Sequence, residues 1–101
     1  MTYNDSKFGE VIESGKILLV KNVMSASVLD PRRRLDYWKE ATGVSNPVCA
    51  HEICNRPATH GGIAVRAFSR DRQKLVYPAC ETCVRRTEML YVSGPFVELN
   101  D

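Results

Sequence analysis

The sequences CAHEIC (residues 49–54) and YPACETC (residues 77–83) contain all four cysteines of this chain. The first pair has the spacing C-x4-C and the second C-x2-C, with 25 residues between Cys54 and Cys80. Two short loops that each offer two thiolates can close on one ion as a tetrahedral site. Thiolate sulfur favours zinc over magnesium or calcium. The spacing therefore predicts one structural Zn²⁺ with the ligands Cys49, Cys54, Cys80 and Cys83.

Two disulfides, or free redox-active thiols, are the alternatives. Disulfides need an oxidising compartment, and Met1 to Glu10 contains no apolar segment of the kind found in signal peptides. The longest apolar run, Ile17 to Val20, is too short to cross a membrane. A redox C-x2-C site is expected within a βαβ pattern, which does not surround Cys80 and Cys83. We therefore expect a cytoplasmic protein, with no membrane segment, whose reduced cysteines bind metal.

The length of 101 residues and the hydrophobic content of 44% predict a single domain with a small core, to whose stability a metal would contribute. The net charge of +2 argues against binding nucleic acid by bulk charge, but the basic residues are clustered. Local clusters decide contact with phosphate. The alternative is a solvated surface balanced by the 12 acidic residues. The candidate residues for binding nucleic acid or a partner are Arg32, Arg33, Arg34, Arg66, Arg70, Arg72 and Lys74.

The N-terminal segment, residues 1–29, contains two β-rich runs on either side of Ser14-Gly15. These runs, Phe8 to Ile12 and Lys16 to Val23, predict a β-hairpin. The second run includes Ile17 to Val20, which is apolar on both faces and needs a cover. The cover is either the core of this chain or a second copy, so a homodimer through this strand is one expectation.

Residues 30–43 predict a helix. Asp30 is suited to the N-cap, Pro31 to the first helical position and Gly43 to the C-terminal end. Leu35 and Trp38 fall on one face of this amphipathic helix, and Trp38 is expected in the core, as are Tyr77 and Phe96. The three arginines that follow Pro31 oppose the helix dipole, which favours an acidic partner or a phosphate beside them.

Residues 48–101 predict a zinc-binding core of short elements. The first cysteine loop precedes a strand from Ile63 to Phe68, a polar turn and a return strand from Lys74 to Tyr77. A short helix from about Cys83 to Met89 follows the second cysteine loop, and a hairpin of Tyr91-Val92 with Phe96 to Leu99 ends the chain.

The order of a cysteine knuckle, a β-hairpin and a second knuckle at the start of a helix is that of a treble clef. The motif Trp38-x3-Thr42-Gly43, the two cysteine pairs, Gly61-Gly62 and Tyr77-Pro78 stand in an order that resembles small bacterial and phage zinc-binding proteins. Those proteins are similar to HNH endonucleases. The resemblance covers about residues 35–101. It implies an α+β fold: a treble-clef, HNH-like ββα core, joined here to an N-terminal β-hairpin and one amphipathic helix.

Two positions depart from the HNH pattern. A histidine on the first strand of an HNH enzyme activates water, and a histidine or asparagine on the helix helps to hold the catalytic metal. Ile63 and Val84 stand at these positions here, and neither can act as a base or a ligand. His60 restores a base only in a shifted register. His51, inside the first knuckle, is expected as an exposed loop residue; the alternatives are that it replaces a cysteine as ligand or donates a hydrogen bond to the site.

The sequence thus predicts a non-catalytic zinc-binding module that binds nucleic acid or a nucleic-acid-handling protein complex. The resemblance to phage proteins extends this to a host-directed, anti-defence inhibitor. One alternative is a metal-dependent, HNH-like endonuclease that uses His60. The other is a protein–protein interaction or dimerisation module.

Overall fold

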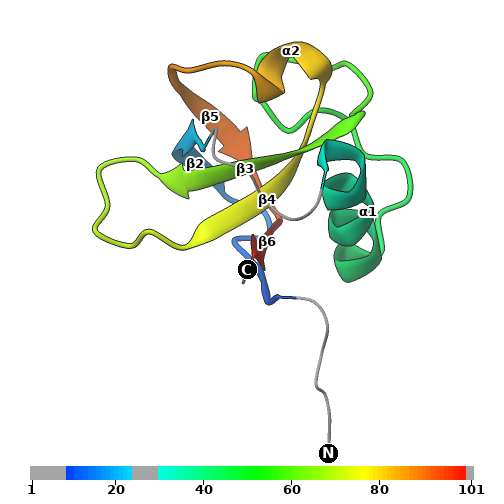
Figure 1. Ribbon diagram of the computed structural model, residues 1–101, viewed down its shortest axis with the longest axis horizontal. Helices are drawn as coiled ribbons and strands as arrows, with labels where there is room; N and C mark the ends of the chain where they lie inside the picture. The colour runs from blue at the N-terminus through cyan, green and yellow to red at the C-terminus, as the bar shows by residue number, and fades with distance from the viewer. Residues whose placement is uncertain (1–8, 24–29, 100–101) are drawn as a thin grey trace, which may run out of the picture.

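The computed structural model describes residues 9–23 and 30–99. This part of the chain forms a small α+β fold with a six-stranded antiparallel sheet and two helices (Figure 1). The strand order in the sheet is β1-β6-β4-β3-β2-β5. None of the helices in these residues is long and apolar enough to span a membrane. The elements are β1 (Val11–Ile12), β2 (Ile17–Asn22), α1 (Pro31–Thr42), β3 (His60–Arg66), β4 (Lys74–Ala79), α2 (Glu81–Val84), β5 (Met89–Ser93) and β6 (Phe96–Leu99).

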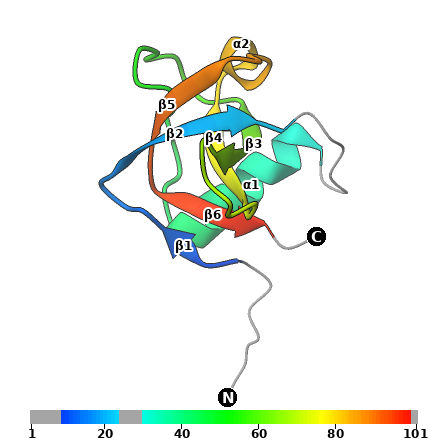
Figure 2. The same cartoon turned by 90° about the vertical axis from the view of Figure 1, so that its left-hand side faces the viewer.

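The two ends of the described chain form one long antiparallel ribbon that is bent in the middle. β2 pairs with β5 and β1 pairs with β6, and the N–H of Gly94 donates to the carbonyl of Lys16 (2.8 Å) at the bend. A Cβ on Gly94 would lie 2.1 Å from the carbonyl oxygen of Glu13, so these two segments of the chain can approach so closely only at a glycine. One half of the ribbon joins β3 and the other joins β4, which curls the sheet (Figure 2).

The two predicted hairpins are therefore wrong in their pairing, although the strands fall where expected. β1 and β2 do not pair with each other, and neither do β5 and β6. Ser14-Gly15 and Gly94-Pro95 lie at the bend of the ribbon instead of reversing a hairpin. Each pair of runs is one bent strand, whose partner lies at the other end of the chain. Phe8, which the first predicted strand included, lies outside the described residues.

Helix α1 begins and ends as predicted. The side chain of Asp30 accepts a hydrogen bond from the N–H of Arg33 (2.9 Å), Pro31 is the first helical residue, and Gly43 ends the helix in the left-handed region at φ 79°. Its apolar face, with Leu35 and Trp38 buried, covers one face of the sheet at β3, β4 and β6.

Gly61 and Gly62 allow close packing on both faces of β3. A Cβ on Gly61 would lie 2.5 Å from the backbone nitrogen of Leu35 in α1, and a Cβ on Gly62 would lie 2.6 Å from Cζ of Tyr77. Glycines in a strand commonly mark such a close approach. The helix and the tyrosine ring thus press on the sheet from opposite sides at the start of β3.

The core has two parts, one on each face of the sheet. Trp38, Ile63, Val76, Val97 and Leu99 pack beneath α1. The other part contains Tyr77 and Phe96, whose rings meet edge to face with centroids 6.5 Å apart, together with three of the cysteines. The expected core positions of Trp38, Tyr77 and Phe96 are confirmed. Because the cysteines belong to this second part, the metal-binding cluster is continuous with the apolar core.

Candidate metal centre and its basic surroundings

All four cysteines converge on one point. Their Sγ atoms lie within 4.8 Å of one another, and Cys54 Sγ lies 3.7 Å from Cys80 Sγ. The cysteines form no disulfide. A tetrahedral ion with metal–sulfur bonds of about 2.3 Å places its sulfurs about 3.8 Å apart, close to the observed separation. The cluster thus has the dimensions of a four-thiolate metal site.

The first knuckle is a tight loop closed by backbone hydrogen bonds. The N–H of Cys49 donates to Arg56 (2.7 Å), and the N–H of Cys54 donates to His51 (2.9 Å). An isolated bridge between Val48 and Pro57 joins the two ends of the loop. These bonds hold the two cysteine side chains on the same side of the loop before any ion binds.

The second knuckle is the start of α2. Cys80 is the N-cap residue, and its Sγ accepts a hydrogen bond from the N–H of Cys83 (3.4 Å). A thiolate at this position replaces the side-chain oxygen of an ordinary N-cap. The C-x2-C spacing therefore serves the helix and the metal site at once. The helix itself, Glu81–Val84, is shorter than the sequence predicted, because the chain enters β5 at Met89.

The thiols differ in acidity. Burial raises the pKa of Cys80, but hydrogen bonds from the Cys83 backbone and from the neighbouring thiols outweigh burial and lower it to about 7. Burial raises the pKa of Cys83 to about 12, with the neighbouring thiols adding to the rise. Burial also raises the pKa of Cys49. A metal ion must therefore displace protons from the buried thiols, as metal sites in proteins commonly do.

His51 contacts the metal centre without belonging to the four-sulfur cluster. Its Nδ1 lies 3.3 Å from Cys83 Sγ, and the residue is only 7% exposed. The expectation of an exposed loop histidine is wrong, because a bridge to Val92 ties the loop to the edge of β5. Burial, with Arg86 nearby, lowers the pKa of His51. A neutral imidazole with its proton on Nδ1 can donate to the thiolate of Cys83.

An open pocket of about 250 Å³ leads to the cluster. It exposes parts of Cys54, Cys80 and Cys83 and is bordered by His51, Ile53, Asn55, Arg56, Thr82 and Arg86. Cys54 is half-buried, whereas the other three cysteines are buried. The pocket gives an ion a path to the site.

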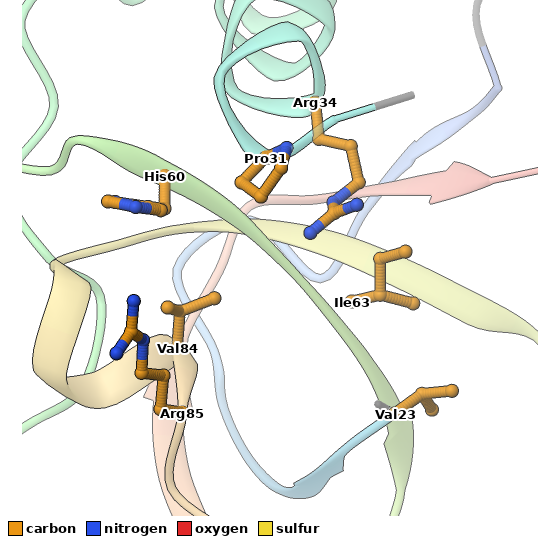
Figure 3. A pocket seen from close by; sticks show the side chains of 7 residues that line it. All are labelled: Val23, Pro31, Arg34, His60, Ile63, Val84 and Arg85. Atoms are coloured by element: carbon orange, nitrogen blue, oxygen red, sulfur yellow. The ribbon is translucent and has the colours of Figure 1, made fainter. Parts of the chain in front are cut away.

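A second pocket, of about 230 Å³, lies between the start of α1, the start of β3 and α2. His60 and the guanidinium groups of Arg34 and Arg85 surround it, and Val23, Pro31, Ile63 and Val84 form its apolar lining (Figure 3). Arg34 Nε donates to the carbonyl of Gly61 (2.7 Å), and His60 Nδ1 lies 2.7 Å from Thr59 Oγ1. Burial lowers the pKa of Arg34, although Asp30 opposes the shift. We call this space the Arg34–His60–Arg85 pocket.

The predicted basic residues fall into two groups, at opposite ends of β3. Arg32 and Arg33 are exposed on the first turn of α1, beside the Arg34–His60–Arg85 pocket. Arg66, Arg70, Arg72 and Lys74 lie on the turn that joins β3 to β4 and on its flanks. Arg66 is paired with Asp71 (2.8 Å) and Glu13 (3.1 Å), so its charge is largely neutralised. Arg70 and Arg72 are exposed.

The sequence did not single out three residues that the structure places at these sites. Arg85 faces His60 across the pocket, Asn22 holds α2, and Phe68 stands exposed on the basic turn. Arg85 and Arg86 are adjacent basic residues, but nothing in the sequence connects them to Arg34.

Comparison with protein-family models, with curated proteins and with solved structures found no match to this chain. The fold and the site define the class: a small α+β protein with a four-cysteine cluster that can bind a metal ion.

Proposed function

We propose that this protein is a non-catalytic zinc-binding module that binds nucleic acid, alone or within a nucleic-acid-handling protein complex. The convergence of the four Sγ atoms within 4.8 Å supports the zinc site, and the Arg34–His60–Arg85 pocket supports the binding of nucleic acid. The cysteines join the first knuckle to α2, and α2 presents Arg85 toward Arg34 and His60. The metal would thus fix the geometry of a basic pocket at some distance from itself.

Zinc fits the donor set better than calcium or magnesium does. Four thiolates provide soft ligands, which calcium and magnesium do not favour. Four protein ligands also complete a tetrahedron and leave no position for water, as in structural zinc sites. Elemental analysis of the reduced protein should give about one zinc per chain.

We propose that this site derives from an HNH-like treble clef. The knuckle, the β3–β4 hairpin and the second knuckle at α2 follow one another in the expected order. The pocket between β3 and α2 is where such a frame would place its chemistry. Ile63 and Val84 line that pocket here, as the sequence pattern predicts for a non-catalytic scaffold.

Phosphate is the ligand that the Arg34–His60–Arg85 pocket suits. Two guanidinium groups and an imidazole surround an apolar floor, and no carboxylate is among the described residues that line it. Arginine donates hydrogen bonds in a planar fork that matches phosphate oxygens. Arg32 and Arg33 continue the positive charge along the first turn of α1, which allows contact with neighbouring phosphates of a polynucleotide.

Salt dependence of binding tests this proposal. Fluorescence anisotropy with labelled single-stranded and duplex oligonucleotides should give an affinity that falls as salt rises. Arg85→Ala should weaken binding and reduce the slope of log K against log salt by about 0.7–0.9, the amount expected for one lost phosphate contact. Lys39→Ala, which removes one charge from the other end of α1, is the matched control. An affinity that does not change with salt concentration, or an equal loss of affinity in both variants, would contradict the proposal.

A nuclease that uses His60 is the second candidate, because His60 does face the pocket. It predicts cleavage of plasmid DNA with magnesium or manganese that His60→Ala abolishes. A magnesium or manganese ion needs oxygen ligands, and the described residues that line the pocket supply no carboxylate. Intact plasmid after long incubation with these ions would eliminate this candidate.

A protein partner is the third candidate, as a homodimer or as the target of a host-directed, anti-defence inhibitor. At Val20 and Lys21, β2 lies between β3 and β5, so a second copy cannot add a strand there. Among the described strands, Ile17 and Leu18 are paired with β5 alone. Ile17, at 53% exposure, is the residue of the Ile17 to Val20 run most open to a second copy. Light scattering should show a dimer that Ile17→Lys dissociates; a monomer at high concentration would remove the homodimer.

A further inference from the structure

Phe68 is the most exposed large hydrophobic residue in the described part of the chain. Its relative exposure is 89%, and it stands on the turn that joins β3 to β4. Its backbone has φ 57°, in the left-handed region that a residue with a bulky side chain rarely adopts. Strained residues of this kind concentrate at functional sites. The fold therefore keeps an aromatic ring in solvent at a cost in both hydration and backbone strain.

The ring borders the largest of the described pockets, about 500 Å³, between this turn and the edge of the sheet at β5. Cross-strand register places Met89, Lys21 and Val65 in one row on the floor of this groove, because Lys21 pairs with Met89 on one side and Val65 on the other. Tyr91, 60% exposed, lies two residues along β5 from Met89 and so on the same face. Met89 and Tyr91 thus lie exposed on one face of the sheet, next to the turn that carries Phe68.

The polar groups around this groove are mostly basic. Lys21 and Arg72 line it, and Arg70 is exposed on the same turn as Phe68. Among the described residues that line the groove, the only acid is Glu88, whose carboxylate is paired with Arg86 (2.9 Å). Positive charge beside exposed aromatic rings is the combination with which proteins bind single-stranded nucleic acid, because the rings stack on bases while the cations contact phosphates. A protein partner with an apolar surface has no need of this charge.

The groove lies on the same face of the sheet as the Arg34–His60–Arg85 pocket. Ile63 and Val23 line that pocket, whereas Val65 and Lys21 line the groove. Each pair of residues is two positions apart on its strand, and successive residues of a strand alternate between faces. Both sites therefore lie on the same face of β2 and β3.

We propose that this groove binds single-stranded nucleic acid, with an unpaired base stacked on Phe68. The inference rests on the proposed function and specifies its substrate as single-stranded. Phe68 and Tyr91 supply the stacking surfaces, and Lys21, Arg70 and Arg72 contact the backbone. Phe68 should add nothing to the affinity for duplex DNA, because the bases of a duplex are already stacked on one another.

Anisotropy titrations with a labelled 12-residue oligo(dT), its RNA counterpart oligo(U) and a duplex of equal length test this inference. Phe68→Ala should weaken binding of the single strands by about tenfold and leave duplex binding unchanged. Phe68→Trp should keep the wild-type affinity, because its ring also stacks. Val44→Ala removes another exposed apolar side chain, 40% exposed just past the end of α1 and outside the lining of the groove and of the two other pockets described, and should change nothing.

Phe68→Gly separates binding from folding. Glycine adopts φ 57° without strain, so this variant should melt at a higher temperature than Phe68→Ala and yet bind single strands as weakly. Single-strand binding that Phe68→Ala does not weaken overturns the inference. If the protein binds duplex with a salt-dependent affinity while Phe68 has no effect, the proposed function stands and this inference fails. If no oligonucleotide binds, even where a protein partner does, both fail.

Discussion

The hydroxyl of Tyr77 donates a hydrogen bond to Oδ1 of Asn22, deep in the core beside the metal-binding cluster. The Nδ2 group of Asn22 donates in turn to the carbonyls of Cys83 (3.1 Å) and Arg86 (2.9 Å). Asn22 lies at the end of β2, so the N-terminal part of the chain satisfies the carbonyl groups at the end of α2. The second cysteine knuckle is thereby anchored to the sheet even without a metal ion.

Asn22→Ala should destabilise the protein by about 1–3 kcal/mol, because it leaves the Tyr77 hydroxyl without its acceptor in the core and removes the side-chain hydrogen bonds to the carbonyls of Cys83 and Arg86. Urea denaturation of the zinc-loaded protein measures the loss. The variant should also lose zinc to a chelator faster, since α2 loses its support. Lys21→Ala, one residue earlier on the exposed face of β2, is the control. Equal stability of the two variants would show that Asn22 does not anchor α2.

The alkaline stability of the fold should depend on Tyr77. Burial raises the pKa of this hydroxyl well above its ordinary value, and the nearby Cys49 adds to the rise. The unfolded chain releases the proton near pH 10, before the folded protein does. The stabilisation by the neutral hydroxyl is therefore complete below pH 10 and decreases as the pH rises above it.

Denaturation of the wild type and of Tyr77→Phe at several pH values measures this effect. The stability difference between them should be constant from pH 7 to about 9 and should shrink above about pH 10. Tyr91→Phe, which changes an exposed hydroxyl, should follow the wild type throughout. A difference that stays constant to high pH would mean that Tyr77 ionises no later in the folded protein than in the unfolded one.

Gly62→Ala should destabilise the fold by about 1–3 kcal/mol through overpacking. The new Cβ would lie 2.6 Å from Cζ of Tyr77, a side-chain atom that can move or be removed. Tyr77→Leu should therefore cost less in the Gly62→Ala background than alone. The same test at Gly61 should show no such coupling, because a Cβ there meets the backbone of Leu35. Additive effects at Gly62 and Tyr77 in thermal melts would contradict the packing argument.

The features that local sequence determines were predictable. The bounds of α1 follow from Asp30, Pro31 and Gly43, whose conformational preferences act within a few residues. The cysteine cluster follows from spacing, because two short loops constrain their own thiols. Strand positions follow from runs such as Ile17 to Val20.

Strand partners were not predictable, because a turn signal does not distinguish a hairpin from a bend. Ser14-Gly15 has the composition of a hairpin turn, yet the chain continues past it into a strand that pairs with β6. The pairing depends on Gly94, some 80 residues away, because the absence of a Cβ there lets the two segments of the chain approach each other. The burial of His51 has a similar origin, since its bridge partner Val92 belongs to a distant strand.

His51→Ala should lower the affinity for zinc by about 10–100-fold, the usual effect of losing a hydrogen-bond partner of a metal ligand. The loss follows because Nδ1 of His51, 3.3 Å from Cys83 Sγ, would no longer stabilise that thiolate. Competition with a chromophoric chelator at fixed pH measures the affinity. Glu52→Ala, the exposed neighbour in the same loop, is the matched control. Cobalt substitution adds a readout that a general loss of stability would not move: the charge-transfer bands of the cobalt–thiolate centre should shift in His51→Ala and stay in place in Glu52→Ala. Unshifted bands together with an unchanged affinity for zinc would show that His51 is a core residue without influence on the metal site.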